Sequence, residues 1–212
     1  MSTRAYSSPV REQKARQTRE AILEALFDLI RGADRPEDIG MEEVGRAAGV
    51  QRRTVFRHFA TRETLFAEFW VWLNDRIGVS PAPRVPEDIL DGPRAAFPRF
   101  DTHEAVMRAM LHSRTGREMR AGTVERRREN FERALAPVCD GLPPETAARI
   151  TAVAHLLYSA SAWEVLKDYG GLSGAQAGET ASWALEVILS AVTRGEDCAD
   201  VSSHTKDSDH ES

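Results

Sequence analysis

The sequence predicts an all-α protein with two domains, a small N-terminal one built of three helices and a larger helical one that follows it. Two observations favour helices: apolar residues recur at spacings of three and four along most of the chain, and no run alternates apolar and polar residues over the length of a strand. Five prolines between residues 78 and 98 separate the two helical regions. A chain of 212 residues, 42% of them hydrophobic, can bury a core in each region.

Residues 1–10 lack periodicity and are expected to form a flexible N-terminal arm. An amphipathic helix should follow over residues 11–31 and end near Gly32. Its apolar stripe is formed by Ile22, Ala25, Leu26, Leu29 and Ile30. We expect this helix to support the two shorter helices that follow it.

Residues 41–59 fit two short helices that cross at a tight turn. Gly49 stands where the turn needs a residue that tolerates positive φ, and Gly45 leaves room for the second helix to cross closely. The expected buried face consists of Val44, Ala48, Val50, Val55 and Phe59. The side chains left pointing outward from the second helix are Gln51, Arg52, Arg53, Thr54, Arg57 and His58. Such donors suit phosphates and base edges, which makes DNA the first partner to consider.

The run VGRAAGVQRRTVFRHFATRETLF, residues 44–66, resembles the helix-turn-helix of the TetR (tetracycline repressor) family of bacterial regulators. The resemblance covers residues 11–77, and the spacing G-V, F-R-H-F, R-E-x-L is specific. Two positions depart from the family pattern. The usual Tyr is Phe56, which removes a phenolic donor that commonly meets a phosphate, and the usual capping Ser is Gln51, a weaker N-cap.

The resemblance implies a homodimeric, ligand-responsive transcriptional repressor that places its second motif helix in the major groove of a palindromic operator. Activation would use the same residues. The predicted DNA-binding residues are Gln51, Arg52, Arg53, Thr54, Phe56, Arg57, His58 and Arg62. Arg52, Arg53 and Thr54 are the candidates for base contact, because they stand at the exposed start of the helix. His58 could instead be partly buried and bridge this helix to the next one.

The formal net charge of −5 does not exclude DNA, because the acidic excess lies at the C-terminus. Residues 195–212 contain six acids and one lysine, and we expect residues 196–212 to form a disordered acidic tail. Cations are frequent near the other end, at Arg4, Arg11, Lys14, Arg16 and Arg19. They could form a basic arm in the minor groove, or the terminus could simply be disordered.

A further helix should open at Thr61 and connect the first domain to the second. Its wide apolar stripe consists of Leu65, Phe66, Phe69, Trp70, Leu73 and Ile77. We therefore assign the DNA-binding domain with its connecting helix to residues 11–77. The prolines that follow predict that any helix within residues 78–98 is short or broken.

Helical spacing returns over residues 102–112, 117–138, 144–169 and 173–193, so that residues 78–195 form the second domain, for ligand binding and dimerisation. Its last two helices are too apolar to remain exposed, which predicts pairing with a second copy. This pairing also resembles the four-helix dimer interface of the TetR family. The predicted interface residues are Val153, Leu157, Ala181, Leu185, Ile188 and Leu189.

A small apolar or aromatic effector is expected to bind between the middle helices, because methionine and aromatic walls with a few polar tips suit such a molecule. The predicted ligand-binding residues are Phe97, Phe100, Met107, Met110, Phe131, His155, Tyr158 and Trp163. Ordinary core packing is the alternative for each of them.

Neither a catalytic nor a metal-binding set is apparent in the sequence. His103, His112 and His155 are not paired at helical spacing with another ligand, and Cys139 and Cys198 lack metal-type spacing. We therefore expect no enzymatic activity, cofactor or metal. The sequence contains no apolar run of membrane-spanning length and no leader, so we expect a soluble, cytoplasmic protein. The alternative function is a helical small-molecule-binding or enzymatic protein whose N-terminal domain serves protein contacts.

Overall fold

The computed structural model describes residues 9–33, 35–79 and 82–194, and all regular structure within these ranges is helical. The predicted all-α class is therefore confirmed. The acidic tail expected at 196–212 lies outside the described residues. So does the N-terminal arm expected at 1–10, except for Pro9 and Val10, which open the first helix.

The described residues divide into two compact units, and the division differs from a single boundary at the proline-rich segment. The first unit contains residues 9–79 together with 99–124, and the second contains residues 82–98 together with 125–194. Residues 99–124 return to the first unit because α6 (Glu104–His112) packs on α1 (Pro9–Gly32), and α7 (Arg114–Ala121) packs on α4 (Arg62–Arg76). The predicted N-terminal domain is thus joined by two helices that follow it in sequence.

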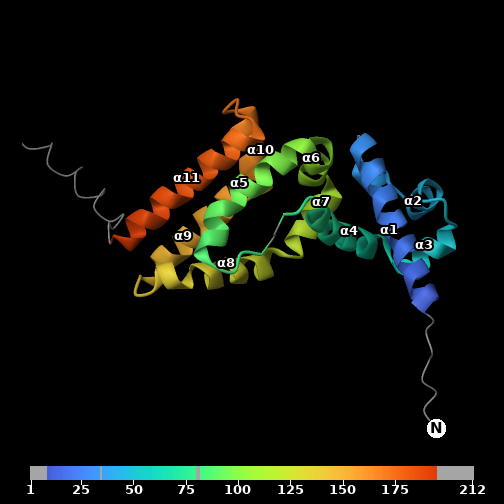
Figure 1. Cartoon of the computed structure of the whole chain (residues 1–212), viewed down its shortest axis with the longest axis horizontal. Coiled ribbons are helices and arrows are strands. Elements are labelled where there is room, and N and C mark those ends of the chain that lie inside the picture. The colour runs from blue at the N-terminus through green and yellow to red at the C-terminus, as the bar shows by residue number, and fades with distance from the viewer. Residues whose placement is uncertain (1–8, 34, 80–81, 195–212) are drawn as a thin grey trace, which may run out of the picture. The chain divides into compact units, whose positions relative to one another are not determined.

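The long helix α1 carries the core of the first unit. Ile22, Leu26 and Ile30 are completely buried, as their spacing along one face predicts. A short 3-10 helix, η1 (Pro36–Asp38), leads into α2 (Met41–Ala47), which packs on α1 (Figure 1).

The crossing of α2 and α3 (Arg52–His58) depends on two glycines. Gly49 has a φ of +66°, which confirms that the turn needs a residue without a Cβ. A Cβ on Gly45 would lie 3.1 Å from the carbonyl oxygen of Val50 and 3.2 Å from Cγ2 of Val55, so the close approach is confirmed as well. The backbone N–H of Val50 donates to the Gly45 carbonyl at 2.8 Å and closes the turn.

Helix α4 begins where the sequence predicts. The Thr61 hydroxyl accepts a hydrogen bond from the backbone N–H of Thr64 and caps the first turn. Leu65, Phe69 and Leu73 then form a fully buried stripe, which packs in the first unit.

The expectation of a short or broken helix among the prolines is wrong. Helix α5 (Pro86–Thr102) is continuous over 17 residues, with Pro93 and Pro98 inside it. Pro86 stands in the first turn, where its missing N–H costs nothing, and each internal proline removes one backbone hydrogen bond. Ile89 and Phe97 are completely buried, and this burial offsets the local cost.

The second unit consists of part of α5 together with α8 (Val124–Cys139), α9 (Pro144–Leu157), α10 (Ala160–Asp168) and α11 (Gly174–Thr193). The Arg94 guanidinium joins α5 to α11, because its Nε and Nη2 each lie 2.8 Å from a carboxylate oxygen, of Glu179 and Glu186. Its core is formed by Ile89, Phe131, Ala134, Leu135, Ile150, Ala154, Tyr158, Leu185 and Leu189.

Two helices expected to be continuous are divided differently. The segment predicted at 117–138 starts earlier, at Arg114, and breaks at Gly122 and Thr123 between α7 and α8. The segment predicted at 144–169 breaks near Ser159, whose hydroxyl accepts a hydrogen bond from the N–H of Ala162 and caps α10. The last helix starts as expected, with Ser173 and Gln176 forming a capping box.

We expect Gly49→Ala to lower the free energy of unfolding by about 1 to 2 kcal/mol, because an L-residue is strained at positive φ. Gly32→Ala is the matched control, since Gly32 lacks a positive φ and a Cβ there would meet nothing within 4 Å. Urea titration followed by circular dichroism measures both variants. Equal midpoints for the two variants would contradict the proposed role of Gly49.

Candidate nucleic-acid interface

Helix α3 has one buried face and a cationic outer face. Val55 is completely buried and anchors the helix. The exposed positions are Gln51, Arg52, Arg53, Phe56 and Arg57, whereas Thr54 and His58 are half-buried. Residues 51–62 contain no acid, so the outer face carries an uncompensated positive charge, which suits phosphate.

The two departures from the family pattern have visible consequences in the structure. Phe56 is 38% exposed and the Arg52 guanidinium lies 5.2 Å from the centre of its ring, so the aromatic ring supports an arginine rather than presenting a hydroxyl. Gln51 precedes α3 without a side-chain capping bond.

His58 fits the partly buried alternative better than a free phosphate donor. Burial lowers its pKa below the ordinary value, and the neighbouring Arg57 and Arg19 cations lower it further. Its ring is therefore neutral at pH 7. Among the described residues, its Nε2 is buried without a hydrogen-bond partner. Its backbone carbonyl accepts a hydrogen bond from Nη1 of Arg19 at 3.5 Å, which ties the end of α3 to α1.

Arg19 supports the DNA-facing helix instead of joining a basic arm. Its guanidinium lies 4.5 Å from the centre of the Phe59 ring and forms an ion pair with Glu68 of α4. Sequence reasoning missed this role, because Phe59 and Glu68 lie far along the chain from Arg19.

Arg62 is also engaged inside the first unit. Its guanidinium donates to the carbonyls of Ile39 at 3.1 Å, Pro36 at 3.1 Å and Glu37 at 3.0 Å. Both terminal nitrogens also lie 3.3 Å from the Thr115 hydroxyl oxygen, and the group stacks 4.3 Å above the Phe66 ring. These contacts favour a bracing role over the phosphate contact expected from the sequence, since few donors remain for DNA.

The predicted ligand-binding residues are divided between the two units. Phe100, Met107 and Met110 are buried in the first unit, and Phe97 and Trp163 are buried in the second.

Three of the predicted ligand-binding residues meet in the second unit. The Phe131 ring centre lies 4.9 Å from that of His155 and 5.3 Å from that of Tyr158. Burial raises the pKa of Tyr158 to about 12 and lowers that of His155, and the Arg127 cation lowers both. A neutral imidazole and a neutral phenol among aromatic carbons suit a weakly polar molecule.

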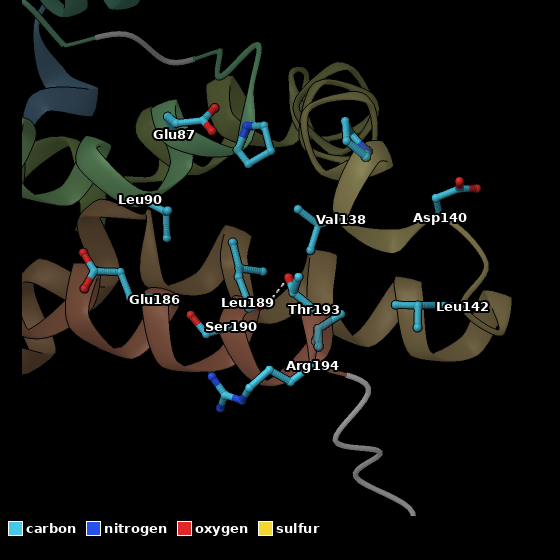
Figure 2. Close-up of a pocket in the computed structure, with 13 residues that line it drawn as sticks. Glu87, Leu90, Val138, Asp140, Leu142, Glu186, Leu189, Ser190, Thr193 and Arg194 are labelled. Carbon is cyan, nitrogen blue, oxygen red and sulfur yellow. Dashed lines mark hydrogen bonds between the residues drawn. The ribbon is translucent and has the colours of Figure 1, made fainter.

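An open groove in the second unit lies elsewhere. It has a volume of about 820 Å³, and Leu90, Val138 and Leu189 lie at its centre with charged side chains around them (Figure 2). A smaller cleft of about 320 Å³ lies between α4 and α7 in the first unit. Neither cavity is lined by any of the eight predicted ligand-binding residues.

The predicted dimer residues divide into surface and core. Val153 is 39% exposed, and Leu157 and Ile188 are half-buried. Ala181, Leu185 and Leu189 are buried inside the second unit, because that face of α11 packs on its own chain, so they are unavailable to a second copy. The large apolar side chains exposed on α9, α10 and α11 are Val153, Leu156, Val165, Trp183 and Val187.

Other chemistry was sought over the same ranges. Within residues 9–33, 35–79 and 82–194, no three His, Cys, Asp or Glu side chains are grouped to hold a metal ion. None of the helices described is both long and apolar enough to cross a membrane.

Residues 36–69 match the model of the family described as bacterial regulatory proteins, tetR family. The matched segment contains η1, α2, α3 and the first half of α4, and the match confirms the resemblance that the sequence shows. No curated protein is significantly similar to the chain.

The chain is also similar to solved structures of TetR-family regulators. NalD, the secondary repressor of the MexAB-OprM multidrug efflux pump in Pseudomonas aeruginosa, has 19% identity and a TM-score of 0.58, over 81% of this chain and 95% of that one. A tetR-family transcriptional regulator from Streptomyces coelicolor has 18% identity and a TM-score of 0.56, over 88% and 86%. A TetR transcriptional regulator from Rhodococcus sp. RHA1 has 22% identity and a TM-score of 0.50, over 84% and 97%. This likeness establishes the fold, a helix-turn-helix domain followed by a helical domain.

We expect Arg62→Ala to lower the free energy of unfolding by about 1 to 3 kcal/mol, because several acceptors lose their donor at once. Arg57→Ala, at an exposed position of α3, should change it by less than about 0.5 kcal/mol. Urea titration of both variants separates a brace from a surface cation. An Arg62→Ala protein as stable as Arg57→Ala would return Arg62 to the phosphate-binding set.

Proposed function

We propose that this protein is a transcriptional regulator of the TetR type, a homodimeric repressor that binds a palindromic operator and is released by a small apolar or aromatic molecule. The observation that carries the proposal is α3: a cationic, exposed helix held across α2 by Gly45 and Gly49. It lies inside the segment that matches the tetR family model.

In this proposal, α3 enters the major groove, which is wide enough for one helix. Arg52 and Arg53 stand at its exposed start and read base edges, together with Thr54. Gln51 and Arg57 contact the backbone, and Phe56 supports Arg52. Arg62 and His58 position the helix from behind rather than contacting DNA. Two copies related by a twofold axis would read the two halves of a palindrome.

The dimer is proposed to form through the outward faces of α9, α10 and α11. Trp183 is 63% exposed, Leu156 59%, Val165 53% and Val187 50%. Side chains of this size gathered on three consecutive helices indicate a surface that a partner covers. This set replaces Ala181, Leu185 and Leu189, which are part of the core.

Ligand release is proposed by the same reasoning from chemistry. NalD is a repressor of a multidrug efflux pump, and the cluster of Phe131, His155 and Tyr158 in this chain suits an aromatic effector. Such a molecule acts by binding better to the state that does not fit the operator. A coupling of about 1 to 3 kcal/mol would loosen operator binding several-fold or more.

We expect Arg53→Ala to weaken binding to the operator by about 1 to 3 kcal/mol if a bidentate base contact is lost, with little effect on a random duplex. Arg133→Ala is the control, because Arg133 is an equally exposed arginine on α8 of the second unit. Fluorescence anisotropy with the DNA upstream of the gene, at several salt concentrations, measures both. Equal binding of random and upstream DNA by the wild-type protein would favour the alternative of an N-terminal domain that serves protein contacts.

We expect Trp183→Glu to weaken dimerisation by about 30-fold or more, because an exposed tryptophan at an interface commonly contributes 2 kcal/mol or more. Val71→Glu is the matched control: Val71 is 66% exposed, on α4 of the first unit. Sedimentation of both variants over a range of concentrations reports the monomer–dimer equilibrium. An unchanged equilibrium in Trp183→Glu would place the interface elsewhere.

A further inference from the structure

The cleft between α4 and α7 is a cavity that the proposed function does not use. It is contained within the first unit, its volume is about 320 Å³, and both of its walls are helical. Its lining residues are Arg62, Glu63, Phe66, Ala67, Thr115, Glu118, Met119, Gly122 and Thr123. The volume is at the lower end of the range for small-molecule sites, which suits one fused ring system.

The walls of the cleft are apolar. Phe66 and Ala67 come from α4, and Met119 faces them from α7. One face of the Phe66 ring is already covered by the Arg62 guanidinium, so its remaining surface and the flexible Met119 side chain are what a ligand would meet. Methionine adapts its shape to flat aromatic rings and makes favourable sulfur contacts with them.

The charge of the cleft is acidic. Glu63 and Glu118 are exposed carboxylates, one on each helix. Hydrogen bonds from its own backbone N–H and from the Thr61 hydroxyl lower the pKa of Glu63, so it is an anion at pH 7. The cation in the lining, Arg62, has its donors directed to carbonyls and to Thr115. A ligand therefore meets negative charge at the cleft and no guanidinium turned toward it.

The cleft adjoins the hydrogen bonds that join α7 to the DNA-binding motif. Thr115, in the first turn of α7, receives both terminal nitrogens of Arg62 at 3.3 Å. The start of α7 is fixed, because the Ser113 hydroxyl caps it by accepting from the N–H of Gly116. A molecule that parts α4 from α7 would stretch the bonds to Thr115, and the same guanidinium holds η1, the segment that leads into α2.

We propose that the cleft between α4 and α7 binds a compact aromatic amine, with its ring between Phe66, Ala67 and Met119 and its ammonium group near Glu63 and Glu118. Binding weakens the contact of α7 with Arg62 and so reduces DNA affinity from within the first unit. The binding step stands by itself, and the effect on DNA rests on the proposed function.

Isothermal titration calorimetry of the full chain with tryptamine, indole and indole-3-acetate tests the site and its charge. We expect saturable binding of tryptamine, two- to fivefold weaker binding of indole, as about one exposed ion pair would give, and the weakest binding for indole-3-acetate. Glu63→Gln combined with Glu118→Gln should remove the preference for tryptamine. An order in which indole-3-acetate binds as tightly as tryptamine overturns the proposal.

The position of the site is tested with Ala67→Trp, which fills the cleft from an exposed position on α4. We expect tryptamine to bind this variant about tenfold or more weakly. Ala95→Trp is the control, because Ala95 is an exposed alanine on α5 that does not line the cleft. Equal tryptamine binding by the two variants, or no saturable binding by the wild type, overturns the proposal.

The effect on DNA is measured separately, as operator affinity with and without saturating tryptamine. We expect the operator to be released by tryptamine in the wild type and less in Thr115→Val, which has already lost the acceptor for Arg62. Unchanged operator affinity at saturation would overturn the coupling while the calorimetry decides the site. Failure to bind any operator in the absence of tryptamine would count against the proposed function alone.

Discussion

The first unit depends on the guanidinium of one residue, Arg62. This residue begins α4, but its hydrogen bonds end on segments 23 to 26 residues before it and 53 residues after it. A guanidinium can serve several acceptors at fixed angles and remain charged, whereas the ammonium of lysine is a single point. Because η1 leads directly into α2, the first motif helix is held by the same group that holds α7. The position of α3 then follows from the close crossing at Gly45.

Arginines of the first unit serve two separate purposes. Arg19 and Arg62 each lie over a phenylalanine ring and donate to backbone carbonyls, so their charge stabilises the packing of α1, η1 and α4. Arg53 and Arg57 lie on the exposed side of α3 and add to the local positive potential. A net charge of −5 for the whole chain is compatible with this arrangement, because phosphates respond to the nearby field and distant charges are screened.

Local sequence signals predicted the all-α class, α1, the crossing of α2 and α3, and the start of α4, because these features depend on residues close together in the chain. Prediction failed where distant packing decides. The continuity of α5 through Pro93 and Pro98 reflects burial on neighbouring helices. An apolar stripe also cannot say which body covers it: Leu185 packs in its own core, and Trp183 on the same helix is exposed. The inward turn of Arg62 had no sequence signal, since its acceptors include carbonyls, which every residue carries.

The division of the chain between units has a consequence for its biosynthesis. Helices α1 to α4 leave the ribosome first, followed by the part of α5 that belongs to the second unit, and only then by α6 and α7, which complete the first unit. Until Thr115 has been added, the Arg62 guanidinium lacks its α7 acceptor, and the faces of α1 and α4 that α6 and α7 cover are open to the solvent or to a chaperone. The nascent chain therefore holds every residue of α3 well before it holds the domain that supports α3. That support is complete only when residue 124 of 212 has been translated, past the midpoint of the message.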